Sequence, residues 1–147
     1  MNINVKIKFL QKGAAYPLYA TEGSAAADLR ACIDEPVTIN PGEIKTLPTG
    51  IALSPDSDGV VALIFGRSGM GAKHGVTLSN AVGVVDSDYR GEICVSLINH
   101  GSEPYTVSNS NRIAQLMFVP VYKAHFITAD LLDETARGNG GFGSTGE

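Results

Sequence analysis

The sequence predicts an all-β domain, a β-sandwich or distorted jelly-roll with one short helix. Residues 3–9 alternate apolar and polar side chains, which is the period of a half-buried strand. Further short runs rich in β-branched residues recur along the chain, separated by turns that contain glycine or proline. A sustained helical period is missing, so strands must build the core.

After the first strand, the expected strands follow one another in short runs. Asn40-Pro41-Gly42 and Pro48-Thr49-Gly50 are the clearest turn signals between them. The runs are 37–39, 44–47, 51–53, 60–65, 75–78, 82–85, 93–98, 105–107 and 113–122. We expect residues 60–65 to be buried on both faces. Residues 68–73 are the best helical candidate, and residues 129–136 are a weaker one.

Length and charge limit the class of protein. A chain of 147 residues fits a single domain, expected here over residues 1–136, with a flexible glycine-rich arm over 137–147. Eleven basic against fifteen acidic residues leave a net charge of −4, which argues against nonspecific nucleic-acid binding. The apolar runs are too short to span a membrane. Cys32 and Cys94 lie in apolar runs and are expected to be buried free thiols, which favours the cytoplasm.

The C-terminal arm allows two interpretations. Residues 137–147 hold five of the 17 glycines, one aromatic residue and several groups that can bind phosphate. Such a segment is either a disordered terminus or a ligand-binding flap. In the second case Arg137, Ser144 and Thr145 would bind phosphate and Phe142 would cover a planar ring.

Two further segments interrupt the strand pattern. Residues 66–75 follow a strand directly, so Arg67, Ser68 and the glycines form either an anion site at a helix start or a turn capped by Ser68. In residues 24–31, small residues precede Asp28, which is either a strand-capping residue or a functional carboxylate.

Residues 79–92 are the most unusual stretch. Two short apolar strands, expected to form a β-hairpin, flank a turn crowded with carboxylates. Asp86 at the mouth of that hairpin is a candidate general base for a water, and Tyr89 could pack under a ligand ring. A polar surface turn is the alternative. In residues 111–116, strand alternation places Arg112 and Gln115 on opposite faces.

The order and spelling of these segments resemble the trimeric dUTP pyrophosphatase (dUTPase) family. Five motifs of that family occur here in order, between residues 24 and 146: SAAADLRA, GRSGMGAKHGV, GVVDSDYRGE, NRIAQ and RGNGGFGSTG. The resemblance implies a homotrimer of jelly-roll subunits with active sites at the subunit interfaces. It also implies hydrolysis of dUTP to dUMP and pyrophosphate with Mg²⁺.

The resemblance also implies residue roles. Asp86 would activate the water that attacks the α-phosphorus, and Tyr89 would exclude a ribose 2′-hydroxyl. Asn80 and the backbone through Val85 would recognise uracil, and Phe142 would stack over it. Asp28 would hold Mg²⁺ through water, and Arg112 would make a structural pair with Asp88. The phosphate ligands would be Arg67, Ser68, Gly69, Gln115, Arg137, Gly143, Ser144 and Thr145.

Two alternative functions stay open at this point. The dCTP deaminases share the fold, but the DSDYRG and GFGSTG segments favour the pyrophosphatase. A nucleotide-dependent regulatory protein would use the same pocket to control a partner.

Overall fold

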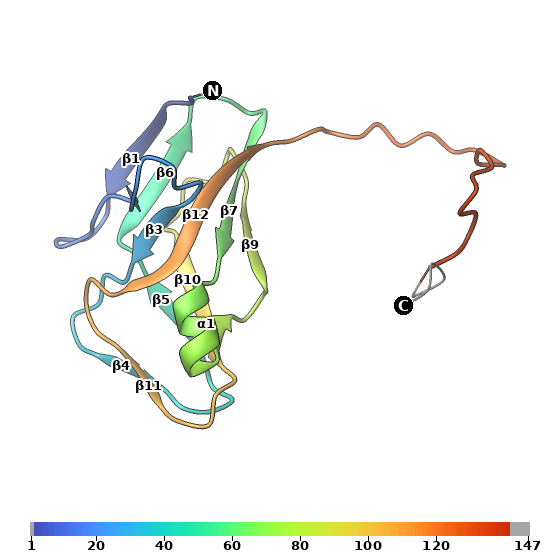
Figure 1. Ribbon diagram of the computed structural model, residues 1–147. Coiled ribbons are helices and arrows are strands. Elements are labelled where there is room, and N and C mark those ends of the chain that lie inside the picture. Colours follow the sequence, from blue (N-terminus) through green and yellow to red (C-terminus); the bar gives the residue numbers. More distant parts are fainter. Residues whose placement is uncertain (1, 142–147) are drawn as a thin grey trace.

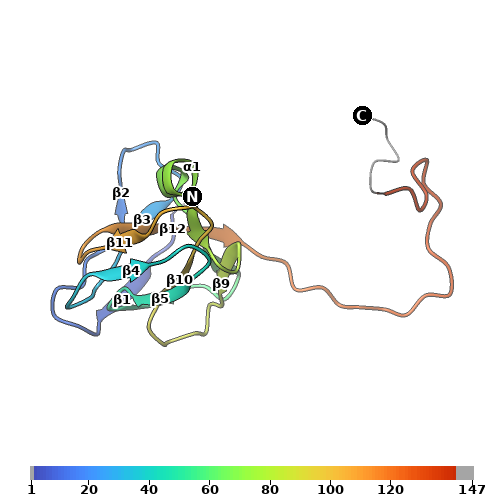
Figure 2. The same ribbon diagram turned by 90° about the horizontal axis from the view of Figure 1, so that it is seen from below.

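The computed structural model describes residues 2–141, so Phe142, Gly143, Ser144 and Thr145 lie outside the described residues. Within that range the chain forms an antiparallel β body with one short helix, as the sequence predicts. Residues 121–141 leave this body in an extended path without strand or helix (Figures 1 and 2). No helix of the described part is long and apolar enough to cross a membrane.

The strands are short, and most coincide with the predicted runs. The elements are β1 (Val5–Phe9), β2 (Leu18–Tyr19), β3 (Ala27–Arg30), β4 (Val37–Ile39), β5 (Ile44–Pro48), β6 (Ile51–Pro55), β7 (Val60–Phe65), α1 (Ser68–His74), β8 (Val76–Leu78), β9 (Val82–Val85), β10 (Cys94–Asn99), β11 (Tyr105–Val107) and β12 (Arg112–Pro120).

These strands assemble into four antiparallel sheets around one core. The largest sheet has the order β2-β3-β12-β7-β9, and the next has the order β5-β10-β8. Two-stranded sheets β1-β6 and β11-β4 complete the body. The fully buried side chains come from all four sheets and the loops between them, including Leu29, Ile39, Ile51, Leu97 and Ile113. The arrangement is therefore a sandwich with a shared core.

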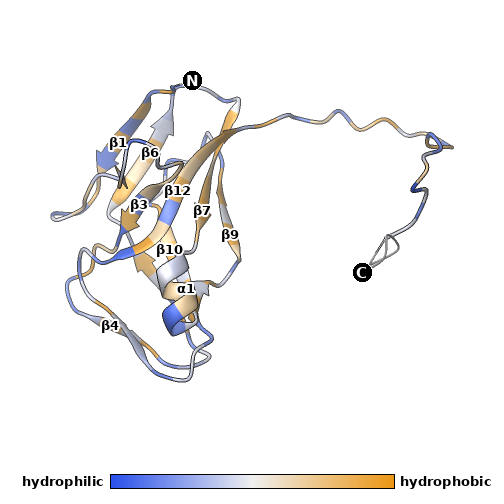
Figure 3. Cartoon of the chain, viewed as in Figure 1, coloured by the Kyte–Doolittle hydropathy of each residue, from blue (hydrophilic) through white to orange (hydrophobic). Residues whose placement is uncertain are grey.

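The five-stranded sheet has an apolar outer face that this chain leaves partly uncovered. Ala62 and Ile64 of β7 point into the core, whereas the alternate residues of that strand are only half-buried. The expectation that residues 60–65 are buried on both faces is therefore wrong for the single chain. By strand register, the outer sheet face consists of Val61, Leu63, Phe65, Val82, Val84, Met117 and Val119. Figure 3 shows the apolar colouring along β7 and β12.

Three other expectations are also corrected. Residues 129–136 form no helix, and Leu131 and Leu132 are exposed. Cys32 is buried but Cys94 is exposed, because β10 turns Val95, Leu97 and Asn99 inward and the alternate positions outward. The strand β2 was not predicted from the sequence. The strand β3 lies within residues 24–31, for which a strand was one of the two interpretations.

Candidate active site

The segment with the candidate base connects two sheets. β9 pairs with β7, whereas β10 pairs with β5 and β8. The strands on either side of Asp86 therefore do not pair with each other. The expectation of a β-hairpin at this place is wrong. The two strands belong to different layers, and residues 86–92, the crossover loop, run from one layer to the other.

A pocket of about 270 Å³ lies at the crossover loop. Its lining is Val84, Val85, Asp86, Tyr89, Glu92, Ile93 and Cys94. This Asp86 pocket thus unites three of the predicted site residues, Val85, Asp86 and Tyr89. Asn80 does not line it and is exposed in the turn that precedes β9.

The crossover loop holds Tyr89 in a defined position and leaves the carboxylate of Asp86 free. The Tyr89 N–H donates to the Asp86 carbonyl (3.1 Å), and the Tyr89 hydroxyl donates to the Glu92 carbonyl (3.1 Å). The ring lies so close to Gly91 that a Cβ there would collide with the tyrosine hydroxyl oxygen. Within residues 2–141 no hydrogen bond occupies the Asp86 side chain, so its oxygens can accept a proton from water.

Two arginines share one buried carboxylate at a second cluster. The Nε of Arg67 lies 3.2 Å from one oxygen of Asp28, and Nη1 of Arg112 lies 3.1 Å from the other. Arg67 also donates from Nη1 to the Arg112 carbonyl (3.2 Å). The expected pairing of Arg112 with Asp88 is therefore wrong. Two guanidinium groups against one carboxylate leave this arginine cluster (Asp28, Arg67 and Arg112) with a net positive charge.

A β-bulge brings Gln115 to the same cluster. The register of β12 against β3 shifts between Arg112 and Ala114, so Arg112 stands opposite Arg30 and Gln115 opposite Asp28. Residues 28 and 30 share a face of β3, hence Arg112 and Gln115 also share a face. The expectation that they point to opposite faces is wrong, because simple alternation ignores the extra residue of a bulge.

The start of α1 adds backbone donors beside Arg67. Ser68 and Gly69 are its first two residues, and their N–H groups belong to the helix turn that lacks intrahelical acceptors. The N-cap is Arg67 and makes no side-chain capping bond, so the capping role considered for Ser68 is not seen. A Cβ at Gly69 would meet nothing within 4 Å, so this backbone is open to a ligand. Guanidinium groups and free N–H groups together suit phosphate oxygens.

The donor set fits Mg²⁺ only if the substrate supplies most of the ligands. In the described part of the chain, no group of three histidine, cysteine, aspartate or glutamate side chains lies close enough to hold a metal. Mg²⁺ in phosphate-transfer sites commonly has one or two carboxylates, several waters and the phosphate oxygens. Asp28 supplies one such carboxylate, and each of its oxygens keeps a lone pair beyond the guanidinium bond. The residues therefore fit a metal that arrives with a polyphosphate.

The Asp86 pocket and the arginine cluster lie at opposite ends of the same two strands. Val85 stands opposite Ala62 near the start of β7, whereas Arg67 comes two residues after Phe65, the last residue of β7. Six residues separate position 61, opposite Asp86, from Arg67, which corresponds to about 20 Å of strand. A base acts on a water within hydrogen-bond reach of the reacting group. Asp86 and Arg67 of one chain are therefore too far apart to serve the same phosphates.

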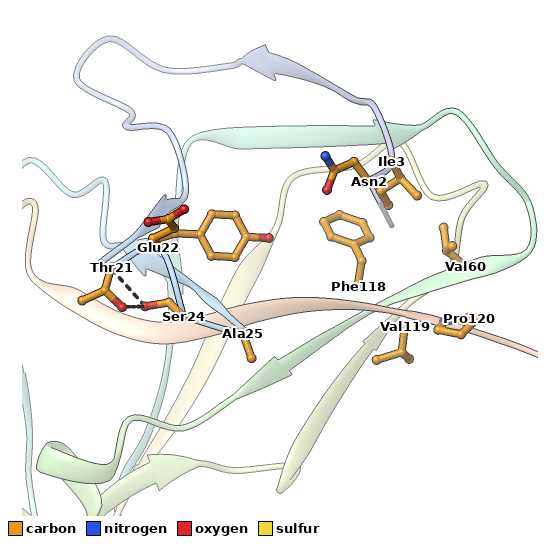
Figure 4. Close-up of a pocket in the computed structure, with 11 residues that line it drawn as sticks. Asn2, Ile3, Thr21, Glu22, Ser24, Ala25, Val60, Phe118, Val119 and Pro120 are labelled. Atoms are coloured by element: carbon orange, nitrogen blue, oxygen red, sulfur yellow. Dashed lines mark hydrogen bonds between the residues drawn. The ribbon is translucent and has the colours of Figure 1, made fainter.

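Two features lie away from both clusters. The largest pocket, about 710 Å³, has a mostly apolar lining with a single carboxylate, Glu22, and is a poor candidate for acid–base chemistry. Figure 4 shows its Phe118 close to Asn2 and Ile3, and the Thr21–Ser24 hydrogen bond at its other side. Arg137 donates from Nε to the Gly140 carbonyl (2.9 Å), and within residues 2–141 it makes no hydrogen bond to either cluster.

Glu92, Ile93 and Cys94 line the Asp86 pocket but were not predicted as site residues, and Glu92 is the charged one among them. It ends the DYRGE run, which could have pointed to it. From the sequence, Arg112 was assigned only to structural pairing, whereas it is one of the two arginines of the arginine cluster.

Comparison with known proteins identifies the family. The dUTPase family model matches residues 12–146. A deoxyuridine 5′-triphosphate nucleotidohydrolase of Desulfitobacterium hafniense is 53% identical over 147 residues, covering 99% of this chain and 97% of the relative. The enzyme of the same name from Neisseria gonorrhoeae is 51% identical and covers 99% of each chain.

Solved structures agree with the fold. A mutant dUTPase of Staphylococcus bacteriophage 80alpha with dUpNHpp has a TM-score of 0.88 at 23% identity and covers 98% of this chain and 99% of that one. A mutant dUTPase of phage phi11, described with a structural Mg(II) ion, has a TM-score of 0.79 at 19% identity, covering 89% and 99%. The resemblance seen in the five motifs is confirmed, and this chain belongs to the dUTPase family.

Proposed function

We propose that this protein hydrolyses dUTP to dUMP and pyrophosphate. The observation that carries the proposal is the Asp86 pocket, in which an unoccupied carboxylate stands beside Tyr89. Full-length similarity to proteins named deoxyuridine 5′-triphosphate nucleotidohydrolase supports it.

In the proposed reaction, Asp86 takes a proton from a water as the water oxygen attacks the α-phosphorus. The bond between the α-phosphorus and the bridging oxygen breaks, and pyrophosphate leaves with the electron pair. When bound, Mg²⁺ neutralises charge on the phosphate oxygens. Removal of a positioned base costs about 10²-fold or more in turnover.

The arginine cluster is proposed to hold the phosphates. Asp28 fixes the guanidinium planes of Arg67 and Arg112. Ser68, Gly69 and Gln115 border the same space. Asp28 is also the residue we propose to contact Mg²⁺ through water. Arg137, Gly143, Ser144 and Thr145 of the arm are proposed to complete the phosphate contacts.

Base and sugar selection are assigned to the segment around β9. Asn80 and the backbone through Val85 are proposed to bind the uracil edge, and Phe142 to stack over the ring. Cytosine would leave buried donors and acceptors unpaired, which can cost about 10⁴-fold in discrimination. Tyr89 is proposed to stand against the deoxyribose where a 2′-hydroxyl would have to fit.

We further infer that the enzyme is a homotrimer with sites shared between subunits. Asp86 and Arg67 of one chain are about 20 Å apart along the strand direction. A single site that uses both residues therefore takes them from different chains. The outer sheet face lies between the two clusters, and Val84 on it is 64% exposed. Residues 121–132 also expose Phe126, Ile127, Leu131 and Leu132. Apolar surface of this extent marks an interface.

Location and domain boundaries are also part of the proposal. Both cysteines are free, which supports a cytoplasmic enzyme. Residues 1–136 are proposed as the domain and residues 137–147 as the arm that closes over the site.

The proposal is tested by substrate choice. With Mg²⁺, we expect pyrophosphate release from dUTP, and much slower release from UTP, dTTP and dCTP. Asp86→Asn should lower turnover of dUTP by about 10²-fold or more, because the water loses its proton acceptor. Wild-type turnover in that variant would refute the role of Asp86. Ammonia release from dCTP would instead identify a deaminase.

A further inference from the structure

The crossover loop begins at the end of β9, which pairs with β7, and its later part needs bonds of its own to the body of the protein. Its inner bonds run from Tyr89 to Asp86 and from Arg90 to the carbonyls of Ser87 and Tyr89. These bonds hold the shape of the loop but do not place it against the sheets. The bonds that do so begin at Glu92 and Ile93.

Glu92 joins three segments through one carboxylate oxygen. Its Oε1 accepts a hydrogen bond from the Gly50 N–H (2.8 Å) and another from Nε2 of Gln11 (3.1 Å). Gly50 in turn accepts the Leu10 N–H on its carbonyl (2.7 Å). The next residue, Ile93, bonds to Thr49 and Ile51 through its backbone. The side chain of Glu92 therefore ties the loop to both the 48–50 turn and the N-terminal segment.

The partner on the body is itself rigid. Gly50 has φ +71°, and a Cβ there would stand 2.6 Å from Cβ of Ala14 and 3.0 Å from Sγ of Cys32. The Gly50 N–H is part-buried. Without the Glu92 carboxylate it would lack an acceptor, and an unpaired buried donor costs folding free energy. A carboxylate also makes shorter and stronger bonds to such donors than a neutral acceptor.

The backbone of Glu92 also supports Tyr89. The tyrosine hydroxyl donates to the Glu92 carbonyl, and the ring packs over Gly91. A shift of Glu92 therefore moves the ring that faces the Asp86 pocket.

We propose that Glu92 is a positioning residue of the active site, whose carboxylate sets the place of the Tyr89 ring by tying the crossover loop to Gly50 and Gln11. This rests on the proposed function, in which Tyr89 excludes the ribose 2′-hydroxyl. Loss of the anchor should let the ring move away and admit UTP. The readout is therefore the preference for dUTP over UTP, which general destabilisation would leave unchanged.

The experiment compares Glu92→Ala, Glu92→Gln and Glu43→Ala. Glu43 is a matched control, because its carboxylate also accepts a backbone N–H, that of Asn40 (2.9 Å), in a turn between β4 and β5. kcat and KM are measured for dUTP and for UTP, with thermal unfolding alongside. We expect Glu92→Ala to lower the ratio of kcat/KM between dUTP and UTP by about 10- to 100-fold. Much of this change should come from a lower KM for UTP, because the 2′-hydroxyl then finds room.

Glu92→Gln keeps a carbonyl acceptor and should recover most of the preference, while Glu43→Ala should keep all of it. An unchanged ratio in Glu92→Ala, with both substrates slowed equally, would overturn the proposal. If that variant does not fold, Gln11→Ala removes one of the two side-chain bonds and should lower the ratio by a smaller factor. An unchanged ratio there would then count against the proposal. A wild-type enzyme inactive on dUTP would instead reject the proposed function.

Discussion

At the scale of single residues, glycine positions differ in what they require. Gly50 combines a left-handed backbone with contact distances that exclude a Cβ. Gly42 has φ +78° but nothing within 4 Å, and Gly23 has neither constraint. The three positions therefore separate backbone strain from packing.

We predict a graded loss of stability for alanine at these positions. Gly50→Ala should cost about 2–4 kcal/mol, because strain and overpacking add. Gly42→Ala should cost about 1 kcal/mol from strain alone. Gly23→Ala should stay within about 0.5 kcal/mol. Urea unfolding measures all three, and equal values at positions 42 and 50 would show that the close contacts are relieved at no cost.

A second residue-scale prediction concerns the thiol in the Asp86 pocket. Partial loss of solvent around the Cys94 thiol raises its pKa, and the negative charge of Glu92 raises it further. The neutral thiol is therefore favoured, and alkylation by iodoacetamide at pH 8 should be slower than for an unperturbed cysteine. Glu92→Gln removes the charge and should shift the alkylation profile to lower pH.

The profile is read by mass spectrometry of the Cys94 peptide as a function of pH. Cys32 is a built-in control, since it is buried and should stay unmodified in the folded protein. A midpoint for Cys94 that does not move in Glu92→Gln would contradict the charge effect.

At the scale of elements, short runs rich in apolar and β-branched residues were predicted well as strands. The runs 37–39, 60–65, 82–85 and 105–107 match β4, β7, β9 and β11 in full. Very short strands were harder, because the two residues of β2 carry no period. The helix 68–73 was confirmed to within one residue, while residues 129–136 lack the packing partner that helices of this length need.

The chain beyond β12 gives an element-scale prediction. Truncation after Thr135 should leave a folded trimer that turns over dUTP poorly, because the phosphate and ring contacts proposed for the arm would be lost. Truncation after Pro120 also removes the exposed apolar residues of 121–132 and should shift the protein to monomers. Light scattering after gel filtration measures the mass. Full activity in the shorter deletion would show that the arm plays no part in catalysis.

At the scale of the whole molecule, the proposed site depends on how chains assemble. The Asp86 pocket and the arginine cluster of one chain lie at opposite ends of β7 and β9, with the apolar outer sheet face between them. In the proposed trimer, each cluster would be completed by another subunit, and one reaction would need both clusters.

We predict that two inactive variants restore activity when mixed. Asp86→Asn and Arg67→Ala each damage a different cluster. After denaturation and refolding together in equal amounts, about one site in four should combine two intact halves. Each variant refolded alone serves as the control. If trimers shown to contain both variants regain no activity, Asp86 and Arg67 act within one chain.

The candidate site was partly visible in the sequence. Residue identities at Asp86, Tyr89, Arg67 and Asp28 stood out, because carboxylates, arginines and glycines interrupt a strand pattern that needs none of them. Their partners were not visible. The pairing of Arg112 with Asp28 spans 84 positions and depends on a bulge that alternation does not reveal.

The sequence by itself determined the all-β class, most strand positions and the motifs of the dUTPase family, because periodicity, turn chemistry and motif spelling are local. Tertiary structure decided which strands pair, and so replaced an expected hairpin with a crossover between sheets. It also decided that Glu92 reaches Gly50 and that two halves of the site lie apart. These features depend on contacts between residues far apart in the chain, where register and packing, not local pattern, set the distance.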